Sequence, residues 1–544
     1  MRKGSVTIYL CLVMTVMVSL VLGCIFSVKV RAGRAQLVLG TDQALFSLLA
    51  GYDRKMLDDF DVFFLDGGCG TSAFHLEKLC QRVEGDLAYA ADPGKGLWPF
   101  AAKSLFEVTP TSVGFTGYTL ASDAGGRIFR DAALRYQKET IGIQAAGAAV
   151  SYLASLQSLT EVQHNAGSTV TAATAEGHLS QAQDAANAFA GELSAAAQDV
   201  ANAQAAARSA GNVKAEESLL RTSLNRIVYD DEERAKSEEE ALQNSFEKLS
   251  GADAVVTEGI GNVMPYLNVI MQSPILGFTL GDASSVLWKS VPARELYGRR
   301  GHEQGVGVLE IPEGGDSTSD KYLYNEYLLG HLGNRRDIEK DAALLCPTEY
   351  LVAGRTDDAA NVEAVLQRIL LMREGVNLLY LLLDPVKSTT LKTTGFTIAV
   401  FLGQPEMADT LATGLAAAWA YAESLVDLRG LFLGKRNCLL KDSAHWQLGL
   451  ADLPRMLDGT IDGLVKGADI GPDYLDYLRM MLLFEDGEKI LARSLDMVEL
   501  CERGSDRLDF RLDHCLASAT VYVEALSERR IKLVCERSLG YREL

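Results

Sequence analysis

The chain has 544 residues, of which 48% are hydrophobic and 23% are charged. These proportions are ordinary for a globular protein, and they exclude a chain that is disordered throughout. The formal net charge of −20 gives a surface that repels phosphate backbones. Nucleic-acid binding would therefore need a local basic patch, and the pairs Arg299–Arg300 and Arg335–Arg336 are isolated and read as solvated surface.

An uncharged apolar segment runs from Val6 to Val28, close to the start of the chain. As a helix it would be about 34 Å long, which exceeds the roughly 30 Å hydrocarbon core of a bilayer. The sequence therefore predicts a transmembrane helix with ends at Val6 and Val28. A cleaved signal peptide is the main alternative, because it shares the basic start and the apolar core. A lipid anchor on Cys24 is a second one, because residues 21–24 approximate a lipid-modified cysteine site.

Basic residues flank both ends of this segment, so their distribution does not fix its orientation. Only five residues precede the span, and we expect this short end to stay inside while the long remainder is exported. Residues 1–33 are thus interpreted as a tail and a transmembrane helix. We expect a single-pass protein of the cell membrane, with the bulk of the chain extracytoplasmic.

Residues 34–140 are expected to form a membrane-proximal α+β region. A helical pattern leads into the extended segment Val62–Leu65 and then into the turn Asp66–Gly70, which lacks the spacing of phosphate-binding glycine loops. A helix over 71–91 precedes two extended segments that are separated by a break at Thr109–Thr111. Asp123 is placed to cap the helix that follows.

The middle of the chain is strongly biased in composition. Alanine fills 17 of the 41 residues from Thr171 to Gly211, which favours long, thin helices because alanine has high helix propensity and little area to bury. We expect a helical stalk or coiled coil over 141–250, through which chains could self-associate. Its acidic runs lack the order of a calcium-binding loop and are read as a solvated helix face. Residues 251–318 are expected to be an irregular linker, with His302 in an exposed loop.

Residues 319–544 are expected to form a compact C-terminal domain of mixed α+β structure. Residues 347–354 read as a short strand, and two apolar stretches near 378–383 and 396–402 are too short to span a bilayer, so they predict core helices. Helical spacing also marks residues 411–426, 474–484 and 488–500. Residues 515–526 and 531–535 predict a terminal β-hairpin. The predicted fold class is therefore α+β and predominantly helical.

The sequence contains no protease, hydrolase or nucleotide-binding motif. His445 is the most interesting histidine, with Asp442 and Cys438 nearby, because a Cys–His nucleophilic pair can be assembled from separated residues. Glu423 and Asp427 share a helix face, which suggests a catalytic pair. A cap or an ion pair with Arg429 is the simpler interpretation.

The nine cysteines indicate neither a metal site nor a disulfide framework. They contain no CxxC pair, and an odd number lies outside the apolar segment. Cys69 and Cys80 could pair, but small buried side chains are the simpler interpretation for most of the cysteines. We expect no metal and no cofactor.

The start of the chain, Gly4-Ser5-Val6-Thr7-Ile8-Tyr9 with its apolar helix, resembles the TadE/TadG-like pseudopilins of tight-adherence (Tad) pilus systems. Residues 42–49 and 63–68, with the C-terminal runs 419–431, 445–450 and 473–483, are similar to an uncharacterised family of large bacterial membrane proteins. The resemblance implies a minor pilin-like or assembly component. Gly4 matches the glycine that precedes the prepilin cleavage point, but Tyr9 stands where prepilins carry a glutamate. This departure favours a retained membrane protein over a processed filament subunit.

Three functions follow from these observations. We expect a non-enzymatic membrane protein whose partners are the lipid bilayer and other pilus or secretion-system membrane proteins. The alternatives are a membrane-anchored extracytoplasmic hydrolase and an adhesin or other binding protein.

Overall fold

The structure is a computed structural model of the chain. It describes residues 3–91, 108–140 and 269–542, apart from short gaps at 271–272, 281–286, 308–316, 339–342, 402, 439–440, 453–454, 457–460, 469–470, 505–506 and 528–530. The expected stalk over 141–250 lies outside the described residues.

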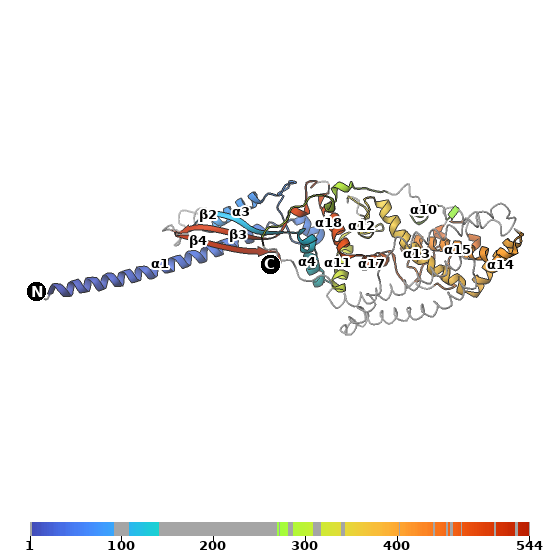
Figure 1. Cartoon of the computed structure of the whole chain (residues 1–544), viewed down its shortest axis with the longest axis horizontal. Helices are drawn as coiled ribbons and strands as arrows, with labels where there is room; N and C mark the ends of the chain where they lie inside the picture. Colours follow the sequence, from blue (N-terminus) through green and yellow to red (C-terminus); the bar gives the residue numbers. More distant parts are fainter. Residues whose placement is uncertain are drawn as a thin grey trace. The chain divides into compact units, whose positions relative to one another are not determined.

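The described residues have mainly helical α+β structure, which confirms the predicted fold class. The longer helices are α1 (Lys3–Leu49), α3 (Leu76–Ala91), α4 (Asp123–Thr140), α11 (Thr318–His331), α13 (Asp358–Leu383), α14 (Pro385–Phe401), α15 (Ala408–Phe432), α17 (Tyr474–Phe484) and α18 (Gly487–Arg503). The shorter helices are α2 (Arg54–Phe60), α10 (Ile275–Leu280) and α12 (Pro347–Ala353). The strands are β1 (Leu65–Asp66), β2 (Val108–Leu120), β3 (Cys515–Ser527) and β4 (Lys532–Gly540) (Figure 1).

The chain divides into two compact units, and each is built from separated parts of the sequence. Unit 1 consists of Met1–Tyr136, Arg294–Gly315 and Ser494–Leu544, and unit 2 of Gln137–Ala293 and Asp316–Arg493. This grouping differs from the consecutive ranges expected from the sequence. The difference arises because β3 pairs with β2 about 400 residues earlier, a long-range pairing that local patterns do not encode.

Unit 1 is organised around an antiparallel sheet with β3 at its centre. β2 pairs with one edge of β3, and β4 and β1 pair with the other edge at different places along it. Buried and partly exposed residues alternate along β3, with Ala519, Val521, Val523 and Ala525 fully buried. One face of the sheet therefore carries a continuous apolar surface.

The second half of α1 and helix α3 provide the apolar partner for this face (Figure 1). On α1 the buried residues Leu37, Thr41, Ala44, Leu45 and Leu48 recur at helical spacing and form one stripe. The stripe packs with residues of α3 and of β3 in a single hydrophobic core. The predicted terminal hairpin, β3–β4, is confirmed, and it belongs to this core.

Two local predictions in unit 1 are wrong for identifiable reasons. The expected break at Thr109–Thr111 is absent, and β2 passes through Pro110 with a register shift before Ser112. An edge strand tolerates such a proline because its outer N–H needs no partner in the sheet. Asp123 does not cap α4: it accepts hydrogen bonds from the Leu120 and Gly305 amides at 2.7 and 2.9 Å.

Unit 2 is helical, with α13, α14 and α15 packed against one another and α10 packed on α15. Helix α15 confirms the helix predicted over residues 411–426, and it is buried over most of its length. The predicted core helix near residues 378–383 is the buried end of α13. The stretch from Phe396 is helical too, but it is only half-buried, with Phe396 at 56% exposure.

The predicted strand at residues 347–354 is wrong, because residues 347–353 form helix α12. Pro347 occupies the first turn, and Gly354 ends the helix in the left-handed conformation with φ of 68°. Proline at the start and glycine just past the end are the usual signals of a short helix. They outweigh the β-branched and aromatic composition between them.

Candidate functional site

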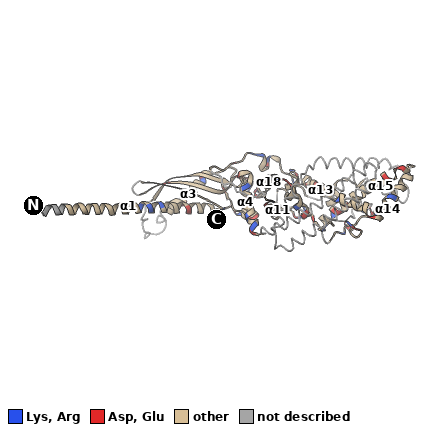
Figure 2. Cartoon of the chain, turned by 60° about the horizontal axis from the view of Figure 1, so that its bottom comes forward, with Lys and Arg blue, Asp and Glu red and all other residues tan. Residues whose placement is uncertain are grey.

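Helix α1 has two halves with different surroundings. Every large apolar side chain from Tyr9 to Val28 is exposed, with exposed fractions between 36% and 71%. From Gly33 onward the helix packs in the core of unit 1. In Figure 2 the exposed half appears as a tan helix that precedes the blue basic residues of α1. In water so much apolar surface would be strongly unfavourable, so it calls for a covering environment.

Among the described residues, α1 is the one helix that is long and apolar enough to cross a membrane. The predicted span Val6–Val28 lies entirely within it. Cys24 is exposed within the apolar half, and the helix continues beyond it without a break to Leu49. The predictions for processing at Gly4 and lipidation at Cys24 stay predictions.

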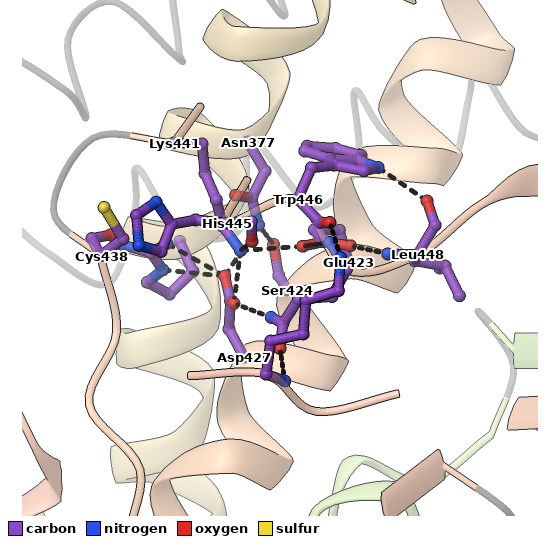
Figure 3. Close-up of polar contacts among 12 residues, drawn as sticks. Asn377, Glu423, Ser424, Asp427, Cys438, Lys441, His445, Trp446 and Leu448 are labelled. Atoms are coloured by element: carbon purple, nitrogen blue, oxygen red, sulfur yellow. Dashed lines mark hydrogen bonds and ion pairs between the residues drawn. The ribbon is translucent and has the colours of Figure 1, made fainter. Parts of the chain in front are cut away.

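A second candidate site is a buried charge network in unit 2, drawn in Figure 3. Glu423 and Asp427 lie one turn apart on α15, and both are buried. The Lys441 Nζ atom lies 2.8 Å from Glu423 Oε1 and 2.7 Å from Asp427 Oδ1. It also donates to the His445 carbonyl at 3.2 Å, so the ammonium is fully engaged. The prediction that the two carboxylates share a helix face is confirmed.

Helix α13 contributes the second cation of this network. Arg373 Nε donates to Asp427 Oδ2 at 3.0 Å, and Arg373 Nη1 donates to the Cys438 carbonyl at 2.8 Å. Asn377, one turn further along α13, donates to the same Asp427 oxygen at 3.1 Å and to the Ser424 hydroxyl at 2.8 Å. Two cations thus balance two carboxylates, as a buried ionic group requires.

The remaining acceptor capacity of the carboxylates is used by residues 447–448. The Gln447 and Leu448 backbone amides donate to Glu423 at 3.0 and 2.8 Å. The Gln447 side-chain amide donates to Asp427 Oδ1 at 2.8 Å. Each of the four carboxylate oxygens therefore accepts at least one hydrogen bond. The network fixes the segment around Lys441–Leu448 onto α15.

The charged state of the network follows from these contacts. Burial by itself would raise the pKa of Asp427, but the Lys441 ammonium and the Arg373 guanidinium outweigh it and hold this pKa below its usual value. Burial would likewise lower the pKa of Arg373, and the neighbouring Asp427 carboxylate raises it. Both groups are therefore ionised at neutral pH. Such a fully bonded carboxylate is a structural anchor rather than a free general base.

Arg429 is not the partner of Glu423 and Asp427, so that prediction is wrong. Its guanidinium instead binds Asp462, with Nε 2.5 Å from Oδ1 and Nη2 3.0 Å from Oδ2, and donates to the Thr279 carbonyl at 3.0 Å. The expected capping role is also wrong, because both carboxylates lie well inside α15. The true partners, Arg373 and Lys441, were missed because nothing in their spacing marks them.

His445 is brought close to Asp442, as its position in the sequence suggests. The His445 ring Nδ1 lies 2.7 Å from Asp442 Oδ1, and the two form a surface pair in which Asp442 is 58% exposed. Hydrogen bonding to the His445 amide lowers the pKa of Asp442. Cys438 contributes its backbone carbonyl to Arg373. These residues therefore lie at the edge of the charge network.

An aromatic group beside the network was also missed in the sequence. The Lys387 ammonium lies 4.6 Å from the centre of the Trp419 ring and 5.3 Å from that of Trp446, and Tyr380 packs on Trp446 at 5.2 Å. Burial lowers the pKa of Lys387. The lysine thus joins α14 to α15 through a cation–π contact.

The turn Asp66–Gly70 is confirmed as a tight turn. The Asp66 carboxylate accepts hydrogen bonds from the Gly68 and Gly70 amides at 2.8 and 3.1 Å. The chain therefore supplies its own anion to the amides that a phosphate would need. His302 is exposed, as expected, and stacks on Tyr297 with ring centres 4.1 Å apart.

All nine cysteines lie in the described part of the chain, and none of them forms a disulfide bond, so Cys69 and Cys80 are not paired. No group of three or more His, Cys, Asp or Glu residues among the described positions is arranged to hold a metal ion.

The comparisons with known proteins identify a family and no function. A family model described as a family of unknown function, DUF5702, matches residues 255–526, which is half of the chain. A search of curated proteins and a search of solved structures each found no significant match. The matched range includes the charge network and nearly all of β3. The chain therefore belongs to the DUF5702 family.

Proposed function

We propose that the protein is a non-enzymatic, single-pass membrane protein with a large extracytoplasmic part, acting as a pseudopilin-like or assembly component of a Tad-type pilus or secretion system. The observation that carries the proposal is the continuity of α1. One unbroken helix holds exposed apolar residues up to Val28 and core residues of unit 1 from Gly33 to Leu49. The anchor and the folded unit are therefore joined without a flexible linker.

The proposed link to a pilus system comes from the start of the chain. Gly4 and the apolar helix resemble TadE/TadG-like pseudopilins, and Tyr9, at 71% exposure, stands where prepilins have a glutamate. A retained helix without that glutamate fits an assembly component that stays in the membrane. Its partners would be the bilayer and other membrane proteins of the system.

The buried network supports a non-enzymatic role. A hydrolase would need a carboxylate or nucleophile that is free to exchange protons with a substrate. Glu423 and Asp427 are instead bonded at all four carboxylate oxygens. We therefore do not favour the hydrolase alternative for this region.

Deletion of the gene, followed by imaging of surface pili, tests the proposal. We expect loss or strong reduction of pili, and recovery when the full-length gene is supplied in trans. A gene in which residues 6–28 are replaced by a cleavable signal peptide should not restore pili, because the unit would be exported without its anchor. Unchanged pili and unchanged adhesion in the deletion strain would refute the proposed role.

A further inference from the structure

Three basic residues follow the apolar half of α1 directly. Lys29, Arg31 and Arg34 lie within six positions, and all three are exposed. No acidic residue occurs on α1 before Asp42. The chain as a whole has a net charge of −20, but this short segment of α1 is positively charged. In Figure 2 the basic residues of α1 are blue and follow the tan apolar stretch. We call Lys29, Arg31 and Arg34 the basic collar.

One end of the sheet packs against α1 at Gly33, between the basic residues of the collar. A Cβ added to Gly33 would lie 3.5 Å from the Val108 side chain and 3.5 Å from the Leu533 side chain, so the helix and the strand ends are in close contact there. Val108 pairs with Ser527 at this end of β2. Gly33 is five residues beyond Val28, about 7.5 Å along the helix axis. The folded part of unit 1 thus begins just beyond the predicted span.

The opposite end of the unit lies much further along the same helix. Tyr541, just after β4, donates a hydrogen bond to the Leu49 carbonyl at 2.6 Å. Leu49 is about 30 Å beyond Val28 at 1.5 Å per residue. That separation is several times the Debye length of about 8–10 Å at physiological ionic strength. Charges at that end, including the exposed Arg542, are therefore screened from a membrane that ends near Val28.

We propose that the basic collar binds the anionic headgroups of phospholipids in the leaflet from which α1 emerges. This inference rests on the proposed membrane anchor. Each basic side chain near an anionic membrane contributes about 1 kcal/mol, which corresponds to roughly a fivefold preference per residue. The collar holds the membrane-facing end of unit 1 against the lipid surface, although the chain as a whole is repelled by it.

The test compares lipid selectivity of the full-length protein reconstituted in phosphatidylcholine membranes that contain some phosphatidylglycerol. Spin-labelled phosphatidylglycerol and phosphatidylcholine report the relative association of each lipid with the protein. We expect the wild-type protein to prefer phosphatidylglycerol several-fold at low salt, and we expect high salt to weaken this preference. The triple variant K29Q/R31Q/R34Q should bind both lipids about equally.

A matched control removes three exposed charges at the far end of unit 1. The variant R54Q/K78Q/R542Q changes the net charge by the same amount, and all three residues are exposed. It should keep the wild-type preference. The proposal would be refuted if both triple variants lost the preference for phosphatidylglycerol equally. It would also be refuted if the wild-type protein showed no such preference. Circular dichroism checks that each variant keeps its helical content.

Flotation with vesicles of pure phosphatidylcholine separates this inference from the proposed anchor. Both triple variants and the wild-type protein should float, because the apolar half of α1 is intact in all of them. If the wild-type protein floats but shows no preference for phosphatidylglycerol, lipid binding by the basic collar is refuted, and the proposed membrane anchor is not. Failure of the wild-type protein to associate with neutral vesicles refutes the anchor, and the collar with it.

Discussion

The α1–sheet core of unit 1 and the α13–α15 layer of unit 2 bury their interiors by different means. The first packs apolar residues such as Leu45 and Val521 on a sheet face. The second encloses Glu423 and Asp427 with Lys441 and Arg373 inside a helical layer. Apolar packing degrades gradually when one side chain is shortened, whereas an ionic network fails when one charge loses its partner. The two regions should therefore respond differently to mutation and to pH.

Removal of the Lys441 charge should have the largest effect. In K441M, Glu423 loses its cation, and Asp427 keeps only Arg373. Breaking a buried pair on one side costs about 3–5 kcal/mol. We expect a loss of that size in the free energy of unfolding, measured by urea titration of the full-length protein in neutral detergent. Trp419 and Trp446 report the transition, because both lie beside the network.

Lys489 provides the control for this variant. It is 60% exposed and lies 3.5 Å from Glu485, and exposed pairs contribute about 0–1 kcal/mol. K489M should therefore leave the urea midpoint nearly unchanged. If K441M were as stable as K489M, the network would not be the stabilising element that we describe.

The apolar packing of unit 1 is tested by two substitutions in helix α1. Leu45 is fully buried in the core of unit 1, and Leu22 is 60% exposed in the apolar half of α1. L45A should cost about 2–5 kcal/mol of unfolding free energy because it leaves a cavity. L22A should leave the urea unfolding of unit 1 unchanged. Equal effects of the two variants would contradict the division of α1 into two halves.

A third buried carboxylate sharpens the comparison, because it is only partly compensated. Glu502 in unit 1 binds Arg507 at 2.9 Å through Oε2, while its buried Oε1 atom has no hydrogen-bond partner. Burial raises its pKa to about 7, against the lowering effects of Lys55 and Arg507. Asp427, with both oxygens engaged, has a lowered pKa instead.

This raised pKa has a definite consequence for stability. A carboxyl with a raised folded-state pKa stabilises the fold below its unfolded pKa of about 4.3, and that contribution is lost as the pH rises through about 7. The loss amounts to up to about 3 kcal/mol. In E502Q the unfolding free energy should therefore vary less between pH 5 and 8 than in the wild-type protein. Urea midpoints across this range measure it, and an unchanged pH slope would count against our account of Glu502.

The smallest effect concerns packing between α14 and α15. A Cβ on Gly395 would lie 2.6 Å from the Ala412 amide nitrogen and 2.7 Å from the Ala408 carbonyl oxygen. Both are backbone atoms, so G395A must push the helices apart, at a cost of about 1–3 kcal/mol. In α10, Gly277 has no atom within 4 Å of such a Cβ, and G277A should be neutral or stabilising by up to about 1 kcal/mol. A thermal scan of both variants distinguishes these outcomes.

Predictability from the sequence differs between the two regions for a physical reason. The helical pattern before Val62, helix α15 and the terminal hairpin follow local apolar patterns, and each was predicted. The pairing of β3 with β2 was not, because strand partners distant in the sequence leave no local signal.

The charge network is a second case in which partners distant in the sequence could not be predicted. Glu423 and Asp427 were recognised as one helix face because their spacing is local. Their partners lie on another helix and in a loop, so Arg429, the nearest cation in the sequence, was chosen wrongly. The strand predicted in place of helix α12 was wrong for a different reason. The proline and glycine at the two ends were given less weight than the composition between them.

Topology in the cell tests the central claim most directly. Protease added to intact protoplasts of the source organism, with detection by antibodies to unit 1 and unit 2, reports which side of the membrane holds the folded parts. We predict that residues 35–544 are digested while a cytoplasmic control protein stays intact, and that the undigested protein fractionates with membranes. Full protection of residues 35–544 in intact protoplasts, with digestion only after lysis, would contradict the account.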